Sequence, residues 1–438
     1  MQQESIVESH IHGIAGLYNE GAYTCYLNSV LQLLSNIPKF RNIFFDKNYQ
    51  EIIIKKYISS CTNTEIDYKL VAVNLIKTLT YQFEKLFVPI WINKYAHTQV
   101  FNAISFRRML GAKHPAFLLP QQQDSDECLR KLVEFIETDI GIENDIEIDL
   151  SDEDKETFAL LSLDDTCIRS QIIKVNPLLV KIHAQYSYLK NKYSRNYSVL
   201  NKMFDLGVLN TITCKNCNTK TFNYVDEISL WIDISSLQMN EDIIEEEIGK
   251  MNKENCDASV EKSTDHESKI TQIITPTLPT TLANPNINNS EFMQNIIKHG
   301  QRRRAVDRIY KKTSYTIENC LEATFKEEII SGRKCDNCKT EADSTKQATI
   351  MELPDTLILS LRRYDYMQNK NSTPIKYDAV FDVSPHIDKD IPVDKIGSTR
   401  YRLVAVINQY GSLECGHYVC NAFNDQIGKW VHFNDDAV

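Results

Sequence analysis

Apolar residues recur at helical spacing directly after a glycine-containing loop near the start of the chain. The loop holds Gly16 and Gly21 and runs into Cys25. After this cysteine, apolar side chains repeat every three to four residues as far as Leu34. This period is typical of an amphipathic helix, so we predict a helix from Cys25 to about Asn36. Cys25 is thereby predicted to lie where a loop becomes a helix.

Two further stretches in the first third of the chain show the helical period. Leu70 to Phe87 carries apolar residues at helical spacing and predicts one core helix. Another helix is expected after Pro120, with Asp124 or Ser125 as its N-cap, because these residue types accept hydrogen bonds from the first turn.

From Phe204 onward the pattern changes to the two-residue alternation of strands. Residues 205–213 run into a Cys-x-x-Cys motif, and residues 221–234 alternate as a return strand. The strand pattern resumes near Tyr315, and residues 401–407, 415–419 and 430–433 predict two or three more strands. The helical pattern thus precedes the strand pattern along the chain.

Two segments carry no such pattern. Residues 1–12 are polar and are expected to be a disordered lead. Residues 239–312 are rich in acidic, amide and Thr-Pro sequence and are interpreted as a disordered insertion. The basic run Arg302 to Arg304 within it is interpreted as a solvated charge run, with a nuclear-import or phosphate-binding patch as the alternative.

The composition limits the classes of partner and compartment. The 438 residues include 49 basic and 59 acidic side chains, a formal net charge of −10, which argues against nucleic acid as the main partner. There is no uninterrupted apolar stretch of membrane-spanning length and no secretory signal, so no membrane partner is expected. Twelve cysteines in such a chain are better interpreted as metal ligands, a nucleophile and buried thiols than as disulfides. We expect a reducing compartment, cytoplasmic and/or nuclear.

Cys25 is a candidate nucleophile because of its predicted position. A thiol at a helix N-terminus lies near unpaired N–H groups and the positive end of the helix dipole, which favour the thiolate. The alternative is that Cys25 is a small buried hydrophobic residue, as most free cysteines are.

Candidate partners for this thiol lie near the end of the chain. His417 follows a glycine in one predicted strand, and Asn434 and Asp435 follow the aromatic residue Phe433. A cysteine, an imidazole and a carboxamide or carboxylate are the components of a thiol-protease triad. The alternative for His417 is a structural histidine on a strand.

Four cysteines predict a structural zinc site. Each Cys-x-x-Cys places two thiolates on one turn, and two such turns can provide a tetrahedral Cys₄ site. The ligands are Cys214, Cys217, Cys335 and Cys338. A single pair could equally be a redox motif, but two pairs, each preceded by strand-like sequence, indicate a zinc ribbon. Four thiolates would leave no open coordination position on the ion, so the zinc would be structural and not catalytic.

Taken together, these segments resemble the ubiquitin-specific proteases, the largest papain-like group of deubiquitinating enzymes. The landmarks are the cysteine segment, the histidine segment, Gln122 to Leu129, both Cys-x-x-Cys pairs, and Leu353 to Tyr364, in the order found in the family. The resemblance implies an α+β, papain-like fold with a helical thumb (about 13–200), zinc-ribbon β-fingers (about 204–237 and 314–350) and a β-sheet palm (about 351–438), interrupted by the insertion at 239–312.

The resemblance also implies the reaction and its residues. It implies hydrolysis of the peptide or isopeptide bond after the C-terminal glycine of ubiquitin, with Cys25 as nucleophile and His417 as base. Asn434 is the expected orienting residue, and Asp435 is the alternative for that role or an assistant to it. Gln123, Asp124 and Tyr418 are expected to bind substrate, and Asp124 is also expected to cap its helix. The partners implied are ubiquitin and ubiquitinated proteins, and the chain is expected to be a monomer whose only cofactor is structural zinc.

The segment before Cys25 departs from the family pattern. The family places its oxyanion-hole asparagine five residues before the nucleophile, whereas Asn19 lies six before Cys25 because one residue, most simply Tyr23, is inserted. Strict counting places Glu20 there, where its charge would oppose an oxyanion. We expect the loop to bulge so that Asn19 still points inward, because loops tolerate an extra residue; the alternative is an oxyanion hole of backbone N–H groups.

Three competing functions remain open on sequence grounds. The first is a ubiquitin-binding scaffold with weak or no turnover, which the Tyr23 insertion favours. The second is a zinc-ribbon adaptor, which leaves the cysteine and histidine segments unexplained and conflicts with the net charge. The third is a protease for a ubiquitin-like modifier.

Overall fold

The computed structural model describes residues 12–61, 67–93, 95–163, 165–234, 245–253, 315–364, 370–412 and 415–438, and a few positions between 298 and 308. The predicted lead at 1–12, apart from His12, and most of the predicted insertion at 239–312 thus lie outside the described residues. The chain divides into two compact units. The first draws on Met1–Ile232, Phe325–Leu361 and Asp378–Val438, and the second on Asp233–Thr324 and Arg362–Tyr377.

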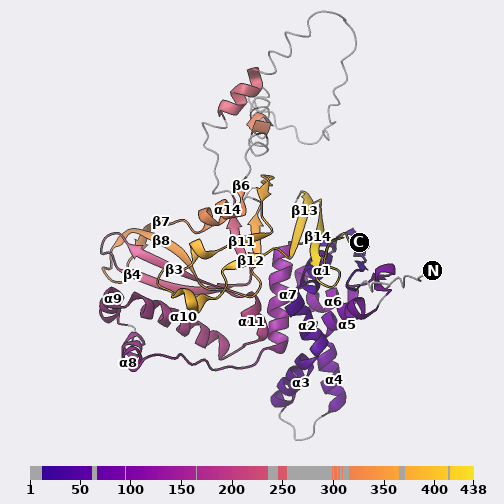
Figure 1. Ribbon diagram of the computed structural model, residues 1–438, viewed down its shortest axis with the longest axis horizontal. Coiled ribbons are helices and arrows are strands. Elements are labelled where there is room, and N and C mark those ends of the chain that lie inside the picture. Colours follow the sequence, from indigo (N-terminus) through magenta and orange to yellow (C-terminus); the bar gives the residue numbers. More distant parts are fainter. Residues whose placement is uncertain are drawn as a thin grey trace, which may run out of the picture. The chain divides into compact units, whose positions relative to one another are not determined.

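Helix α1 (Cys25–Ser35) lies at the centre of the first unit. It begins and ends where the sequence predicts, and ten of its eleven residues are buried. It packs against α2 (Pro38–Asp46), α7 (Ser125–Ile140) and the strands β13 (Ala405–Gly411) and β14 (Gly416–Asn424). Figure 1 shows α1 beside these strands, near the C-terminus. The N-terminal segment of the chain is therefore in contact with the last strands.

The helix predicted over Leu70 to Phe87 is in fact two helices. α4 (Tyr68–Ile76) ends before Lys77, and α5 (Leu79–Ile92) begins after Thr78, whose side chain accepts a hydrogen bond from the backbone N–H of Tyr81. α5 contributes Phe83 and Phe87 to the core, whereas Leu70, Val73 and Ile76 of α4 are exposed. The prediction of one core helix was wrong because a threonine N-cap interrupts the pattern.

Helix α7 follows the predicted local chemistry. The Asp124 carboxylate accepts hydrogen bonds from the backbone N–H groups of Asp126 and Glu127, at 2.7 and 2.9 Å, and so caps the helix. One face of α7 is buried, including Cys128 and Leu132.

A four-stranded antiparallel sheet forms the second part of this unit. Its order is β4–β3–β8–β7, and its strands are β3 (Leu206–Cys214), β4 (Lys220–Glu227), β7 (Glu328–Lys334) and β8 (Glu341–Glu352). Helix α10 (Pro177–Tyr193) packs on β4, and α8 (Asp152–Leu161) and α9 (Thr166–Val175) lie beside it in Figure 1. The predicted strand before the first Cys-x-x-Cys is confirmed. The return strand predicted over residues 221–234 is instead two strands, β4 and β5 (Leu230–Asp233), and β5 pairs in another sheet.

The C-terminal sheet places the predicted histidine segment. Its order is β13–β14–β15, with β15 at Lys429–Phe433, and all neighbours are antiparallel. Near Tyr315 the expected strand has only two residues, β6 (Tyr315–Thr316), and a helix follows it, α14 (Ile317–Thr324). Strands therefore do resume at Tyr315, but the longer ones, β7 and β8, come only after this helix.

The described residues form further helices and strands. The helices are α3 (Asn48–Ser60), α6 (Ile104–Lys113), α8 (Asp152–Leu161), α9 (Thr166–Val175), α11 (Val199–Phe204) and α15 (Val393–Ile396), with short 3₁₀ turns at Glu20–Ala22, Ala96–Thr98, Pro115–Leu118 and Ser384–His386. The strands pair as β1 (Gly16–Leu17) with β2 (Val100–Phe101), β5 (Leu230–Asp233) with β9 (Leu359–Arg362), β11 (Val380–Asp382) with β12 (Arg400–Arg402), and β6 with β10 (Ile375–Lys376).

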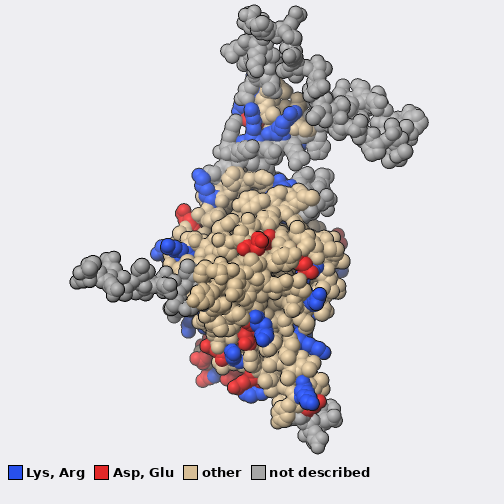
Figure 2. Space-filling view, turned by 90° about the vertical axis from the view of Figure 1, so that its right-hand side faces the viewer, with Lys and Arg blue, Asp and Glu red and all other residues tan. Residues whose placement is uncertain are grey.

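The surface carries charges of both signs. On the face shown in Figure 2, lysine and arginine side chains are scattered among aspartate and glutamate around a broad area that has neither. Among the described residues, no helix combines the length and apolar character that a membrane span requires.

Candidate active site

Cys25 is the first residue of α1, as predicted, and its side chain is fully buried. Burial raises the pKa of the Cys25 thiol above its ordinary value, and nearby Asp435 raises it further. Backbone N–H groups of Tyr418, Tyr26 and Cys25 act in the opposite direction but do not reverse the shift. The expected depression of this pKa by the helix N-terminus was therefore wrong in direction, because desolvation outweighs the helix N–H groups. The resting thiol needs a base to become a nucleophile.

His417 is the second residue of β14, and its imidazole is paired with Asn434. Nε2 of His417 lies 2.6 Å from Oδ1 of Asn434, which directly follows β15. An amide oxygen can only accept a hydrogen bond, so Nε2 carries the proton of the neutral ring. His417 Nδ1 is then the unprotonated nitrogen, which is the form that a general base requires.

Asp435 lies next to this pair as a buried carboxylate. Its Oδ2 is 3.8 Å from His417 Nε2, and the side chain is 8% exposed. Oδ1 accepts a hydrogen bond from Asn28 Nδ2, and Oδ2 accepts one from Asn19 Nδ2, both at 2.8 Å. Burial raises the pKa of the Asp435 carboxyl, while these amide donors and His417 oppose that shift. Asp435 thus connects the first turn of α1 to the imidazole.

A tight turn accommodates the extra residue between Asn19 and Cys25. Residues 20–22 form a 3₁₀ turn in which Gly21 and Ala22 both have φ of 61°. A Cβ atom on Gly21 would overlap the ring of Tyr23, so both the backbone angle and the space favour glycine there. Asn19 Oδ1 accepts hydrogen bonds from the backbone N–H and the hydroxyl of Thr24, at 2.8 and 3.1 Å.

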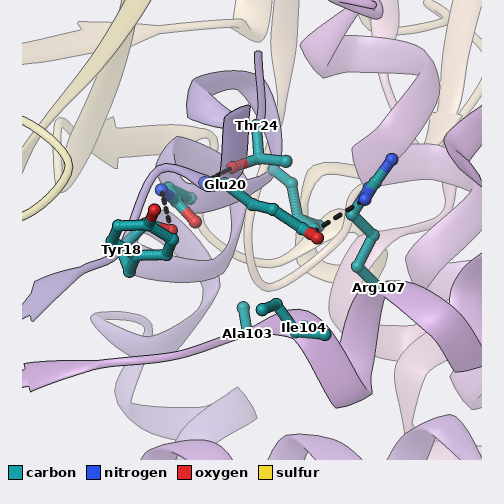
Figure 3. A pocket seen from close by; sticks show the side chains of 8 residues that line it. Tyr18, Glu20, Thr24, Ala103, Ile104 and Arg107 are labelled. Carbon is teal, nitrogen blue, oxygen red and sulfur yellow. Dashed lines mark hydrogen bonds and ion pairs between the residues drawn. The ribbon is translucent and has the colours of Figure 1, made fainter. Parts of the chain in front are cut away.

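Glu20, the residue that strict counting would place in the oxyanion hole, is paired with Arg107. Its carboxylate lies 2.8 Å from Arg107 Nη1, and the guanidinium also lies over the ring of Tyr23. Figure 3 shows Glu20 pointing toward Arg107 at a small pocket that Tyr18, Thr24, Ala103 and Ile104 also line. The loop therefore bulges, with Asn19 against Asp435 and Glu20 against α6. The role of Asn19 toward an oxyanion stays a prediction.

Gln122, the first residue of the predicted landmark Gln122 to Leu129, lies beside Cys25, although it was not among the predicted site residues. Its Nε2 is 3.9 Å from Cys25 Sγ and donates to the carbonyl oxygen of Gly416, while its Oε1 accepts from the Gly416 N–H at 3.1 Å. Asn28 and Arg107 are two other missed residues of this region, and no local motif marks either of them.

The three residues expected to bind substrate lie on two elements. Gln123 and Asp124 precede α7, where Gln123 Nε2 donates to the carbonyl of Ala116 at 3.2 Å and Asp124 caps the helix. Tyr418 follows His417, and its backbone N–H is directed at the Cys25 thiol. Contacts of these residues with a substrate stay a prediction.

The four predicted zinc ligands converge on one point. Cys214 and Cys217 form the turn between β3 and β4, and Cys335 and Cys338 form the turn between β7 and β8. Their sulfur atoms all lie within 4.8 Å of one another, with 3.7 Å between Cys217 and Cys335 and 4.0 Å between Cys214 and Cys338. Four sulfurs at about 2.3 Å from a tetrahedral ion would be about 3.8 Å apart, so the spacing fits a bound metal.

The two turns of this cluster are alike and support one another. Asn218 and Lys339, each directly after its second cysteine, have φ of 55° and 58°. Asn216 Nδ2 donates to Cys338 Sγ and Asn337 Nδ2 to Cys217 Sγ, at 3.6 and 3.7 Å. Hydrogen bonding, first with the Thr219 side chain, lowers the pKa of Cys217 to about 5, which favours the thiolate that a metal binds.

Comparison with known proteins agrees with this geometry. The family model of ubiquitin carboxyl-terminal hydrolases matches residues 15–438. The chain belongs to the ubiquitin carboxyl-terminal hydrolase family. The resemblance found in the sequence is thereby confirmed, and with it the α+β, papain-like class of fold.

Individual members of the ubiquitin carboxyl-terminal hydrolase family match over shorter stretches. Ubiquitin carboxyl-terminal hydrolase 15 of Bos taurus is 30% identical over 162 residues, 35% of this chain and 17% of that protein. Ubiquitin carboxyl-terminal hydrolase 4 of Vanderwaltozyma polyspora is 35% identical over 116 residues, 24% of this chain and 13% of that protein. The matched stretches thus span less than a fifth of these relatives.

Solved structures of similar fold come from a deubiquitinating module. One is the SAGA DUB module of Ubp8, Sgf11, Sus1 and Sgf73 bound to monoubiquitin, with a TM-score of 0.53 and 14% identity over 98% of this chain and 65% of that chain. The same module bound to ubiquitin aldehyde gives a TM-score of 0.52 at 15% identity, covering 98% of this chain and 66% of that chain. At these identities the likeness concerns the fold.

Proposed function

We propose that this chain is a thiol protease that hydrolyses the peptide or isopeptide bond after the C-terminal glycine of ubiquitin. The observation that carries the proposal is the 2.6 Å contact between His417 Nε2 and Asn434 Oδ1, beside the thiol of Cys25 at the start of α1. The family supports the choice of substrate, since its matched members are named ubiquitin carboxyl-terminal hydrolases. The ubiquitin-bound neighbours of similar fold agree with it.

His417 acts as the general base in this mechanism. Asn434 holds the proton on Nε2, so Nδ1 accepts the proton of Cys25 as the thiol attacks the carbonyl carbon. The raised pKa of Cys25 makes this transfer part of the reaction, because the buried thiol is neutral at rest. His417 then protonates the leaving amine, and water releases the acyl-enzyme.

Asp435 and Asn19 assist the reaction of Cys25 with His417. The Asp435 carboxylate, 3.8 Å from His417 Nε2, stabilises the imidazolium that forms when Cys25 loses its proton. Asn19 holds Asp435 through one Nδ2 hydrogen. Its second Nδ2 hydrogen is the donor that we assign to the oxyanion.

Substrate is bound on the segments next to the thiol. Asp124, at the start of α7, offers a carboxylate to the basic tail of ubiquitin, and Gln123 and Tyr418 lie on the segments that flank Cys25. The net charge of −10 favours such a tail over nucleic acid. We further propose a monomer that acts in the cytoplasm, the nucleus or both, where thiols stay reduced.

Zinc is the metal that we assign to the cysteine cluster. Cys214, Cys217, Cys335 and Cys338 supply four thiolates at tetrahedral spacing, the donor set of structural zinc sites. The ion would hold the two turns together at the end of the β4–β3–β8–β7 sheet, and it takes no part in the chemistry.

Hydrolysis of ubiquitin carrying a C-terminal fluorogenic amide tests the proposal. We expect turnover by the wild-type protein and none above background by Cys25→Ala or His417→Ala, with ubiquitin binding retained. Binding of ubiquitin without turnover by the wild type would favour the scaffold, and turnover only of a ubiquitin-like modifier would change the substrate.

A further inference from the structure

The side chain of Gln122 is held in one orientation by the backbone of Gly416. Its Oε1 accepts from the Gly416 N–H at 3.1 Å, and its Nε2 donates to the Gly416 carbonyl oxygen. The Gly416 N–H requires an acceptor and the Gly416 carbonyl requires a donor. If the oxygen and nitrogen of the Gln122 amide were exchanged, two donors would face each other and so would two acceptors. The nitrogen is therefore the end of the amide that lies toward the thiol.

This fixed nitrogen has one hydrogen left for the reaction centre. A side-chain amide carries two N–H groups, and the Gly416 carbonyl takes one of them. The same nitrogen lies 3.9 Å from Cys25 Sγ. An oxygen on the carbon that the sulfur attacks would be within hydrogen-bond reach of it, since such donors act at about 2.7–3.1 Å from the oxyanion.

The side-chain amide of Asn19 is held by Thr24 and Asp435. Its Oδ1 accepts from both the N–H and the hydroxyl of Thr24, and its Nδ2 donates to Asp435 at 2.8 Å. Gln122 comes from a different segment, directly before α7, and contacts the thiol itself. A second side-chain donor at the reaction centre would offset the irregular loop that carries Asn19.

We propose that Gln122 is a catalytic residue whose second Nε2–H donates to the oxyanion of the tetrahedral intermediate. The inference rests on the proposed protease function. When Sγ bonds to the carbonyl carbon, the π electrons move to oxygen, the thiol proton passes to His417, and Gln122 stabilises the negative charge. When the intermediate collapses, the electrons return, the carbon–nitrogen bond breaks and the amine leaves with the proton from His417.

The donor role and a purely structural role predict different kinetics. Loss of one oxyanion donor typically lowers kcat about 10²–10³-fold, with little change in ground-state binding. Ubiquitin aldehyde separates the two roles, because addition of Sγ to its carbonyl carbon places an oxygen where the oxyanion forms. A residue that only supports the substrate path would instead change binding of ubiquitin and of its aldehyde alike.

The experiment compares wild type with Gln122→Ala and Gln122→Glu, and uses exposed Gln121→Ala as the matched control. For each protein, kcat and KM are measured for a ubiquitin C-terminal amide, together with the inhibition constant of ubiquitin aldehyde. Affinity for unmodified ubiquitin is measured in a Cys25→Ala background. Thermal unfolding shows whether each variant is folded. If Gln122→Ala does not fold, the kinetic comparison is made with Gln122→Glu alone.

We expect both Gln122 variants to lose about 10²-fold in kcat and a similar factor in aldehyde affinity, with unchanged KM and ubiquitin affinity and with Gln121→Ala like wild type. Unchanged kcat, or equal losses in aldehyde and ubiquitin affinity, would overturn the inference while leaving the protease function intact. An inactive wild-type protein that forms no aldehyde adduct would instead remove the proposed function and this inference with it.

Discussion

Arg107 lies 2.8 Å from the carboxylate of Glu20, and its guanidinium joins the loop before the nucleophile to the segment before α7. Its Nε donates to the carbonyl of Phe117 at 3.0 Å, and its Nη2 donates to those of Leu118 and Leu119 at 2.9 and 3.2 Å. These two segments carry Asn19 and Gln122. One buried side chain thus contacts both of the segments that carry these amide groups.

Replacing Arg107 is expected to loosen both segments. Arg107→Ala leaves Glu20 and three carbonyl groups without their charged donor, so we expect a loss of about 2–3 kcal/mol in the free energy of unfolding and a lower kcat. Arg107→Lys keeps the charge but cannot make this set of contacts, and it should be intermediate. Chemical denaturation and steady-state kinetics measure both effects, with the neighbouring exposed Arg108→Ala as control. Equal stability of Arg107→Ala and Arg108→Ala would show that these contacts contribute little.

Asn434 is expected to act through the tautomer of His417. Asn434→Ala removes the acceptor of the Nε2 proton and should lower kcat about 10²-fold or more with little change in KM. Asn434→Asp keeps an acceptor oxygen and should stay much closer to wild type. The pH dependence of kcat measures the pair, and a loss as large in Asn434→Asp as in Asn434→Ala would count against the tautomer argument.

The raised pKa of Cys25 predicts how the free enzyme reacts with an alkylating agent. Since burial holds the thiol neutral, alkylation by iodoacetamide at pH 7 should be slower at Cys25 than at the exposed Cys167 and should increase with pH above about 8.5. Peptide mass spectrometry measures the rate at each site. A Cys25 thiol that is fully reactive at pH 6 would contradict the assigned direction of the shift.

The raised pKa of Cys25 also makes the free energy of unfolding depend on pH. A folded-state pKa above the unfolded value contributes stability that is present below about pH 8.5 and is lost as the pH rises through the folded value. Wild type should therefore lose more stability than Cys25→Ala between pH 8.5 and 10, measured by thermal unfolding in matched buffers. Parallel pH curves for the two proteins would speak against a buried neutral thiol.

Removal of metal is expected to destabilise the β4–β3–β8–β7 sheet. We predict one zinc ion per chain by elemental analysis, and a lower melting temperature after chelation or in Cys217→Ser. Cys167→Ser, at an exposed cysteine outside the cluster, is the matched control. Purified protein that is stable, free of metal and unaffected by chelators would exclude a structural zinc.

The sequence predicted those features that depend on local chemistry. The bounds of α1, the cap at Asp124 and the strands around Cys214 follow from periodicity, a carboxylate at a helix start and a turn motif. The division between α4 and α5 was missed because Leu70, Val73 and Ile76 keep the helical period on an exposed face. The threonine cap at position 78 was the available signal.

The parts of the site that were missed depend on contacts between distant segments. Gln122 meets Gly416 across 294 positions of sequence, and Asn28 meets Asp435 across 407. No local pattern encodes such contacts. The direction of the Cys25 pKa was missed for a related reason, because burial depends on the strands that pack over α1 and outweighs the helix N-terminus.

The central claim is that Cys25 is the nucleophile of a protease acting on ubiquitin, and reaction with ubiquitin carrying a C-terminal electrophile tests it most directly. We predict one covalent adduct per chain, located at Cys25 by peptide mass spectrometry, absent from Cys25→Ala and slower in His417→Ala. Binding of ubiquitin without any adduct, or an adduct at another cysteine, would contradict the account.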